Sequence, residues 1–227
     1  MNELALFAGA GGGILASHLA GWRTVCAVEF SAYCARRLMQ RQNEGHLPPF
    51  PIWDDVRTFD GHEWRGVVDV VSGGFPCQAY STAARGRNNA DDLWPEMRRI
   101  VADVAPRYVF AENVIPEAIN GAADDLEQMG YKTRAITLGA DDMGGDHIRK
   151  RSWLLAHADD DGELLRAIDA EALLRKGIPH RVWESDPGIA RVADGVAYRM
   201  ERNRATGNGQ VPIVALGALL LLTHNRY

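Results

Sequence analysis

The first thirty residues constrain the fold more strongly than any other part of the chain. Residues 4–7 form a short apolar run, and a turn with four glycines at positions 9–13 follows directly. Residues 14–20 carry the apolar spacing of a helix that Gly21 is suited to end, and residues 24–28 form a second apolar run. This order of strand, helix and strand predicts a βαβ unit at the start of the chain.

The rest of the chain continues this alternation. Further strands are expected at residues 67–71, 108–111, 131–138 and 151–156, and helices at 31–41, 93–104, 117–129 and 211–223. Alternating strands and helices predict an α/β fold with a doubly wound, mostly parallel, Rossmann-like sheet. Such folds bind ligands beyond the carboxyl ends of their strands. We therefore expect site residues at Glu29, Cys77 and Glu112, which lie at such ends.

Length and cysteine pattern predict one cytoplasmic unit without a metal. At 227 residues the chain is expected to form one domain, or one domain with a small appendage. Its start lacks the basic segment of a secretory signal, and the apolar run 211–223 is too short to cross a bilayer of about 30 Å. Cys26, Cys34 and Cys77 show neither metal-ligand spacing nor a paired framework, which fits a reducing compartment.

The formal net charge of −5, taken alone, argues weakly against a nucleic acid as partner. The basic residues, however, gather beside the motifs described below. They form three groups: Arg85, Arg87, Arg98 and Arg99; Arg149, Lys150 and Arg151; and Arg191, Arg199, Arg202 and Arg204. One such group is typical of a solvated face. The three together predict local patches for a phosphate backbone, with an affinity that falls steeply as salt rises.

The glycine turn FAGAGGG at residues 7–13 indicates a nucleotide cofactor, because glycines let the backbone approach a ligand closely. Glu29 ends the next strand, where a carboxylate can accept hydrogen bonds from both ribose hydroxyls. A dinucleotide site needs Gly or Ala at the position of Ile14, so the dinucleotide fingerprint fails, which argues against an NAD-linked oxidoreductase. S-adenosylmethionine, which has an adenosine but no phosphate, fits better. The alternative is a flexible turn without a ligand.

Cys77 differs in context from the other two cysteines. We expect Cys26 and Cys34 to be buried structural residues. Cys77 instead follows Pro76 at the end of a strand and precedes a polar loop. A nucleophilic thiol needs exposure and a neighbouring positive charge that lowers its pKa, which the nearby arginines could supply.

Five motifs in a fixed order carry a resemblance to a known family. They are FAGAGGG, GGFPCQAYS, AENV, HIRKRSW and RATGNGQVP, and the resemblance that they carry covers residues 4 to about 215. The chain resembles a DNA (cytosine-5)-methyltransferase. The resemblance implies the fold of S-adenosylmethionine-dependent methyltransferases and methylation at C5 of a cytosine flipped out of double-stranded DNA. In its compactness the chain is similar to phage and prophage enzymes.

The resemblance also implies the residues of the reaction. Cys77 would add to C6 of the cytosine, and Glu112, in protonated form, would hold the N3 edge and the exocyclic amine. Arg149 and Arg151 would orient the base and the catalytic loop. Asn113 would brace that loop. Gln78 and Ser81 complete the implied substrate contacts; Ser81 would contact a phosphate near the flipped base.

Cofactor contacts follow from the same resemblance. The implied set is Phe7, Gly9, Gly11, Glu29, Asp55, Val56, Pro76 and Asn208, with Asp54 as a rival of Asp55. Asn208 would return the C-terminus to the cofactor site, and the terminal helix would pack beside the first strand. This chain departs from the family pattern at His147, where the family has Gln, so the role of His147 stays open.

The division of the chain implies weak target selectivity. We expect a cofactor-binding and catalytic domain at residues 1–156, a reduced target-recognition segment at 157–190, and a returning segment at 191–227. The recognition segment is short and acidic, which predicts a short or relaxed target site. Two alternatives stay open: a tRNA cytosine-5 methyltransferase, and a catalytically silent remnant that binds DNA or cofactor. We expect a monomer, without excluding a partner protein that helps recognition.

Overall fold

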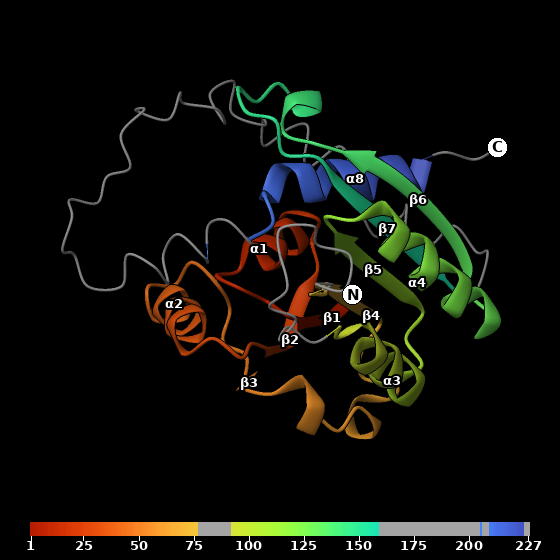
Figure 1. The fold of residues 1–227 in the computed structure, drawn as a ribbon. Coiled ribbons are helices and arrows are strands. Elements are labelled where there is room, and N and C mark those ends of the chain that lie inside the picture. Colours follow the sequence, from red (N-terminus) through yellow and green to blue (C-terminus); the bar gives the residue numbers. More distant parts are fainter. Residues whose placement is uncertain (77–91, 159–204, 206–208, 225–227) are drawn as a thin grey trace, which may run out of the picture.

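In the computed structural model, the described residues are 1–76, 92–158, 205 and 209–224 (Figure 1). They form one seven-stranded sheet with the order β3-β2-β1-β4-β5-β7-β6. The strands are β1 Asn2–Leu6, β2 Arg23–Val28, β3 Ile52–Trp53, β4 Val70–Gly74, β5 Tyr108–Asn113, β6 Lys132–Leu138 and β7 Arg151–His157. The α-helices are α1 Gly12–Leu19, α2 Ala32–Asn43, α3 Trp94–Val104, α4 Pro116–Gln128 and α8 Pro212–His224. The predicted α/β class with a mostly parallel sheet is confirmed.

The direction of the strands places the expected site residues at one edge of the sheet. β1 pairs in parallel with both β2 and β4, and β4 pairs in parallel with β5. β7 is antiparallel to both β5 and β6. Because β7 runs the other way, its first residue, Arg151, lies at the same edge as Glu112 near the end of β5.

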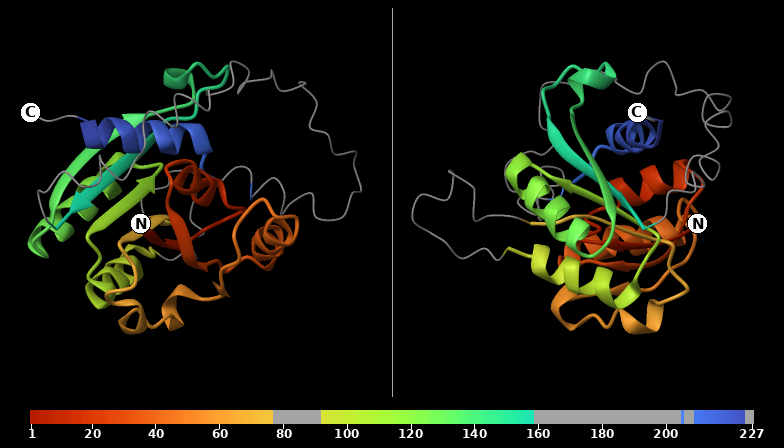
Figure 2. Two further views of the ribbon diagram at one scale, coloured as in Figure 1. Left: turned by 180° about the vertical axis from the view of Figure 1, so that it is seen from behind. Right: turned by 90° about the vertical axis from the view of Figure 1, so that its right-hand side faces the viewer.

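Helices cover both faces of the sheet (Figure 2). Helices α3 and α4 pack on one face over a core that includes Val71, Val109 and Leu154. Helices α1 and α8 pack on the other face over Val70, Phe110 and Trp153. Neighbouring residues of one strand point to opposite faces, which is why the strand sequences are almost continuously apolar. No helix among the described residues is long and apolar enough to cross a membrane.

From the resemblance we expected the terminal helix to pack beside the first strand. Helix α8 packs elsewhere. Its main neighbours are α1, β6 and β7, and its apolar run fills the core between them. Helix α1 follows β1 directly in the chain and occupies the place next to that strand. The helical prediction itself is confirmed, since Pro212–His224 is a single packed helix.

Several strand boundaries differ from the predicted ones, and the structure gives the reason for those of β4 and β5. β4 begins at Val70 rather than at residue 67, because Val67 lies in a turn in which its N–H bonds the carbonyl of Trp64. The valine pattern did not reveal that turn. β5 continues through Asn113, so Glu112 is held within the sheet. The short β3 was not expected at all, since the adjacent prolines indicated a loop.

A buried carboxylate near the start of β1 connects four elements of the fold. Glu3 is fully buried and accepts hydrogen bonds from the hydroxyls of Ser17 on α1, Thr24 on β2 and Ser72 on β4. These three donors satisfy a group that would otherwise be costly to bury. Burial raises the pKa of Glu3, and the three hydroxyls lower it less.

Candidate active site

The glycine turn after β1 adopts a backbone conformation that few residues tolerate. Phe7, Gly9 and Gly11 have positive φ angles of 51°, 56° and 93°. For Phe7 this region is unfavourable, and residues held there often lie at functional sites. The N–H of Gly11 bonds the carbonyl of Ala8 at 3.0 Å, which closes the turn before α1 begins.

Glu29 is fixed against this turn at the end of β2. One carboxylate oxygen accepts the N–H of Gly9 at 2.7 Å, and the other accepts the N–H of Ser31 at 2.7 Å. Burial raises the pKa of Glu29, and the two N–H groups lower it less. Each carboxylate oxygen has a second lone pair, so a clamped Glu29 can still accept hydroxyl groups of a ribose.

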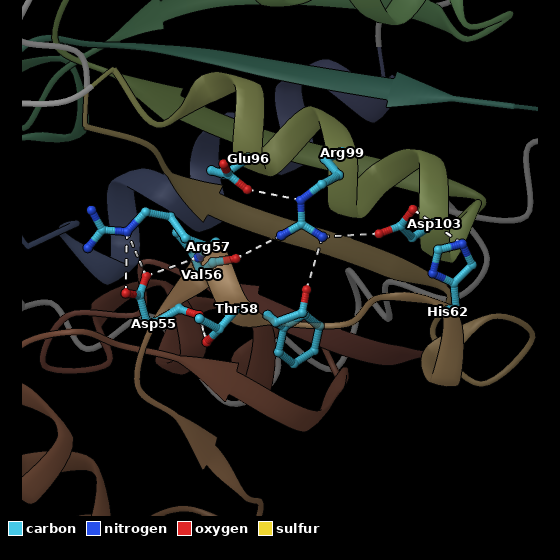
Figure 3. A network of polar contacts seen from close by, with 9 residues as sticks. Asp55, Val56, Arg57, Thr58, His62, Glu96, Arg99 and Asp103 are labelled. Carbon is cyan, nitrogen blue, oxygen red and sulfur yellow. Dashed lines mark hydrogen bonds and ion pairs between the residues drawn. The ribbon is translucent and has the colours of Figure 1, made fainter.

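The segment with Asp55 and Val56 is tied to α3 rather than open (Figure 3). The carboxylate of Asp55 accepts from the backbone N–H and the Nε of Arg57, both at 3.0 Å, and these bonds lower the pKa of Asp55. The side chain of Val56 is buried in the core, and its carbonyl accepts from Arg99 at 2.9 Å. Of the two rival acids, Asp55 is half-buried and Asp54 is exposed.

Arg99 does not belong to a free basic patch. Its guanidinium donates to the carbonyls of Val56 and Phe59 and to the carboxylates of Glu96 and Asp103 (Figure 3). We counted this arginine among the residues for a phosphate backbone, and that interpretation is wrong because its donors are used inside the protein. Arg98 also has an acidic partner, Asp125, at 3.6 Å.

Two exposed aromatic side chains flank Glu29, and the motif analysis missed them. Phe30 is 73% exposed, and the guanidinium of Arg57 lies 5.6 Å from the centre of its ring. Trp53 is 47% exposed, and its carbonyl accepts the N–H of Glu29 at 2.8 Å. Flat side chains beside a ribose-type carboxylate can pack against a purine. The available signal was an aromatic residue directly after the strand-ending acid.

Glu112 is the buried acid of the site. Its side chain is 7% exposed, and its Oε1 lies 3.0 Å from the Nε of Arg151, which starts the neighbouring strand β7. Burial raises the pKa of Glu112, whereas Arg151, Gln210 and Arg149 lower it in that order. A carboxyl with a raised pKa can carry a proton and donate it to a base.

Asn113 connects the ends of β4 and β5. Its Nδ2 donates to the carbonyl of Phe75 at 2.9 Å, and its Oδ1 accepts the N–H of Ile115 at 2.9 Å. The backbone that leads into Pro76 is thereby fixed relative to Glu112. Cys77, Gln78 and Ser81 lie outside the described residues, so their predicted roles stay predictions.

The C-terminal segment reaches the same place. Arg149 donates to the carbonyl of Gly209 at 2.7 Å, and the side chain of Gln210 donates to Oε2 of Glu112 at 3.5 Å. Burial and the nearby Arg151 lower the pKa of Arg149. Asn208 lies outside the described residues. The two residues that follow it, Gly209 and Gln210, return the chain to this site. His147 is 48% exposed, with Nδ1 3.5 Å from a carboxylate oxygen of Asp146.

These elements line one pocket that is open to solvent. Its lining comes from the end of β1, the glycine turn, the end of β4, Glu112 and the returning segment; among the residues are Phe7, Gly9, Gly74, Glu112 and Gln210. The structure thus brings the expected cofactor turn and the expected catalytic acid to one cavity. Arg149 and Arg151 lie beside it, while Asp55 and Val56 lie toward the α3 side.

One group of side chains in the described part of the chain has the spacing to hold a metal ion. It consists of Asp60, His62 and Asp103, none of which lines the pocket. His62 and Asp103 lie beside Arg99 (Figure 3). His62 and Asp60 are exposed, and both ring nitrogens of His62 already face these two carboxylates. Exposed acidic groups of this kind are common without an ion, and we assign no metal here.

Comparison with known proteins agrees with this geometry. Type II methyltransferase M.NgoMIV of Neisseria gonorrhoeae is 28% identical over 164 residues, which cover 68% of this chain and 51% of that protein. Type II methyltransferase M.HhaI of Haemophilus parahaemolyticus is 30% identical over 166 residues, with coverages of 68% and 48%. The chain therefore spans about half the length of the curated relatives it matches.

Solved structures and a family model extend the comparison. The S. pombe Dnmt2 methyltransferase has the same fold, with a TM-score of 0.54 at 20% identity over 69% of this chain and 49% of that one. Residues 1–201 match the family model described as C-5 cytosine-specific DNA methylase. Because this match covers most of the chain, the protein belongs to the C-5 cytosine-specific DNA methylase family.

Proposed function

We propose that this chain transfers a methyl group from S-adenosylmethionine to C5 of a cytosine flipped out of duplex DNA. The observation that carries the proposal is the position of Glu112. It is a buried acid, paired with Arg151, in the same pocket as the glycine turn. Through Asn113 the same strand end is bonded to Phe75, two residues before Cys77.

The reaction needs both a nucleophile and an acid. The thiolate of Cys77 adds to C6 of the cytosine while Glu112 gives its proton to N3, so C5 becomes enamine-like and nucleophilic. S-adenosylmethionine supplies the methyl group on a sulfonium, and C5 takes it. Water then takes the C5 proton, departure of the Cys77 thiolate from C6 restores the ring, the N3 proton returns to Glu112, and S-adenosylhomocysteine is released. Burial of Glu112 favours the protonated form that the first step requires.

The described residues fit this cofactor. The carboxylate of Glu29 is held by Gly9 and Ser31 where a ribose would lie, and the turn beside it is open because no atom lies within 4 Å of a Cβ built on Gly9. Phe30 and Trp53 offer apolar surface for the adenine. Arg151 and Arg149 bond the lining residues Glu112 and Gly209, and from there they are suited to orient the base and adjacent phosphates.

Target selection is proposed to be weak. The recognition segment 157–190 and the returning segment 191–227 stay predictions, since most of these residues lie outside the described ones. We infer a target of two to four bases, read by the short segment, with the loop 78–92 as a second reader. Gel-shift competition tests this inference, and a long, stringent site would contradict it.

The main experiment expresses the protein in a bacterium that lacks cytosine methylation and maps C5-methylcytosine in its DNA. Methylation in a short sequence context is expected for the natural chain and is expected to vanish in Cys77→Ala. Cys26→Ala is the matched control, because Cys26 is buried in the core and does not line the pocket, so it should leave the map unchanged.

Purified protein separates the alternatives. Transfer of a labelled methyl group is measured side by side on duplex DNA and on tRNA. Transfer to tRNA alone would replace the DNA proposal, and binding of S-adenosylhomocysteine without any transfer would identify the silent remnant.

A further inference from the structure

Gln210 occupies space that three glycines leave open. A Cβ built on Gly12 would overlap the backbone carbonyl of Gln210, and one on Gly13 would overlap its side-chain oxygen. A Cβ on Gly74 would lie 3.2 Å from its side-chain nitrogen. The turn after β1 and the end of β4 therefore lack side chains at positions where the C-terminal segment inserts one.

The inserted side chain reaches the catalytic acid. Gln210 donates to Oε2 of Glu112 at 3.5 Å, while Arg151 holds the other oxygen at 3.0 Å. The preceding residue, Gly209, is anchored by Arg149 at 2.7 Å. One residue thus contacts the glycine turn on one side and Glu112 on the other, inside the pocket that both line.

We propose that Gln210 is a positioning residue that couples the cofactor turn to Glu112, so that cofactor binding aligns the acid for the target base. This inference rests on the proposed function and adds a residue to it. Gln210 contacts the turn and donates to Oε2 of Glu112, whereas Arg151 donates to Oε1. Each donor therefore orients one carboxylate oxygen, and Gln210 acts through Glu112 and through the turn. Without its amide, the Glu112 carboxylate loses the donor on Oε2 and, among the described residues, is held by the pair with Arg151, about which it can rotate.

The first test uses the pH dependence of turnover. Gln210→Leu keeps the volume but removes the donor, and we expect kcat to fall about tenfold with the KM for DNA unchanged within twofold. Gln210→Glu adds a second carboxyl beside Glu112, and a like charge raises the pKa of its neighbour. Because Glu112 acts in its protonated form, the alkaline limb of the kcat profile is expected to move to higher pH by about one unit.

The control for turnover is Gln128→Leu, an exposed residue at the C-terminal end of α4 that does not line the pocket. It is expected to keep both kcat and the pH profile. A Gln210→Glu profile that coincides with that of the natural protein would overturn the proposal, and so would an unchanged kcat in Gln210→Leu. Gln210→Glu nearly preserves the shape of the residue, so the test remains decisive if Gln210→Leu does not fold.

The second test needs no turnover and separates this inference from the proposed function. Affinity for S-adenosylhomocysteine is measured by calorimetry in Gln210→Leu, Glu112→Gln and the double variant. Coupling predicts that the double variant loses clearly less affinity than the product of the two single losses. Strictly multiplicative losses would refute the coupling even in an active enzyme, whereas coupling in a protein without methyl transfer would refute only the proposed function.

Discussion

Arg151 and Glu112 form an ion pair of 3.0 Å between two neighbouring antiparallel strands. The pair is largely buried, with side-chain exposures of 16% and 7%. It exists because β7 is antiparallel to β5, so that the start of one strand meets the end of the other. The same contact orients the acid that we place at N3 of the cytosine and shields its charge when no base is present.

Replacing Arg151 by Met should destabilise the protein strongly. The substitution leaves Glu112 buried without its nearest cation, and breaking a buried pair from one side costs about 3 kcal/mol. Urea unfolding at pH 7 measures the loss. Adding Glu112→Gln should recover part of it, because the unpaired charge is then gone. Arg98→Met removes a more exposed pair with Asp125 and should cost about 0.5 kcal/mol; equal losses in the two variants would contradict the analysis.

Glu3 should make stability depend on pH. Its pKa is raised in the folded protein by burial, so the folded state binds a proton more tightly than the unfolded chain. Its contribution is therefore fully present below the unfolded pKa, near 4.5, and declines as pH rises toward the folded pKa. Glu3→Gln cannot ionise, so it lacks this loss of stability. As pH rises through this range, the free energy of unfolding of the variant should increase relative to that of the natural protein by up to about 1.4 kcal/mol per pH unit.

The measurement is a series of urea titrations from pH 4 upward on the natural protein and the variant. Glu63→Gln on the exposed 3₁₀ helix is the control, and its difference from the natural protein should not follow the same course. A Glu3→Gln difference that stays flat with pH would show that Glu3 does not titrate differently in the two states.

Local patterns predicted most of the scaffold. Periodicity located every strand and α-helix that lines the site except β3. Ser31, the first residue of the predicted helix 31–41, caps α2 by accepting the N–H of Cys34 at 3.4 Å. The expected burial of Cys26 and Cys34 is confirmed, and burial raises the pKa of Cys26 to about 11. These features depend on residues close in sequence, which is why pattern analysis finds them.

The remainder depends on contacts between distant segments. Glu112 and Gln210 are 98 positions apart, and Val56 meets Arg99 across 43 positions, so no local pattern reveals either contact. The glycines at 12 and 13 were attributed to close approach of a ligand. In the structure their open space is filled by Gln210. An arginine in a basic cluster likewise looks the same in the sequence whether it faces solvent or holds two backbone carbonyls.

Arg99 should control cofactor affinity through the segment that it holds. Arg99→Met removes the donors to the carbonyls of Val56 and Phe59, so the turn with Asp55 loses its anchor on α3 (Figure 3). We expect affinity for S-adenosylhomocysteine to fall about tenfold and stability to fall by about 2 kcal/mol, as hydrogen bonds from charged donors are lost. Calorimetry and urea unfolding measure the two effects.

Arg99→Lys should lie between the natural protein and Arg99→Met, since an ammonium can reach only some of these acceptors. Duplex DNA affinity should remain unchanged in both variants. If DNA affinity fell while cofactor affinity held, Arg99 would belong to a nucleic-acid surface after all.

The space filled by Gln210 predicts opposite outcomes for neighbouring glycines. Gly12→Ala meets a backbone carbonyl and should cost about 2 kcal/mol in urea unfolding, and removing the Gln210 side chain should not relieve it. Gly13→Ala meets only the side-chain oxygen, so Gln210→Ala in the same chain should recover most of its loss. Gly121→Ala on α4 has nothing within 4 Å and should instead stabilise the protein by about 1 kcal/mol, the helix preference of Ala over Gly. Equal behaviour of Gly12→Ala and Gly13→Ala in the Gln210→Ala background would mean that the returning segment lies differently against the turn.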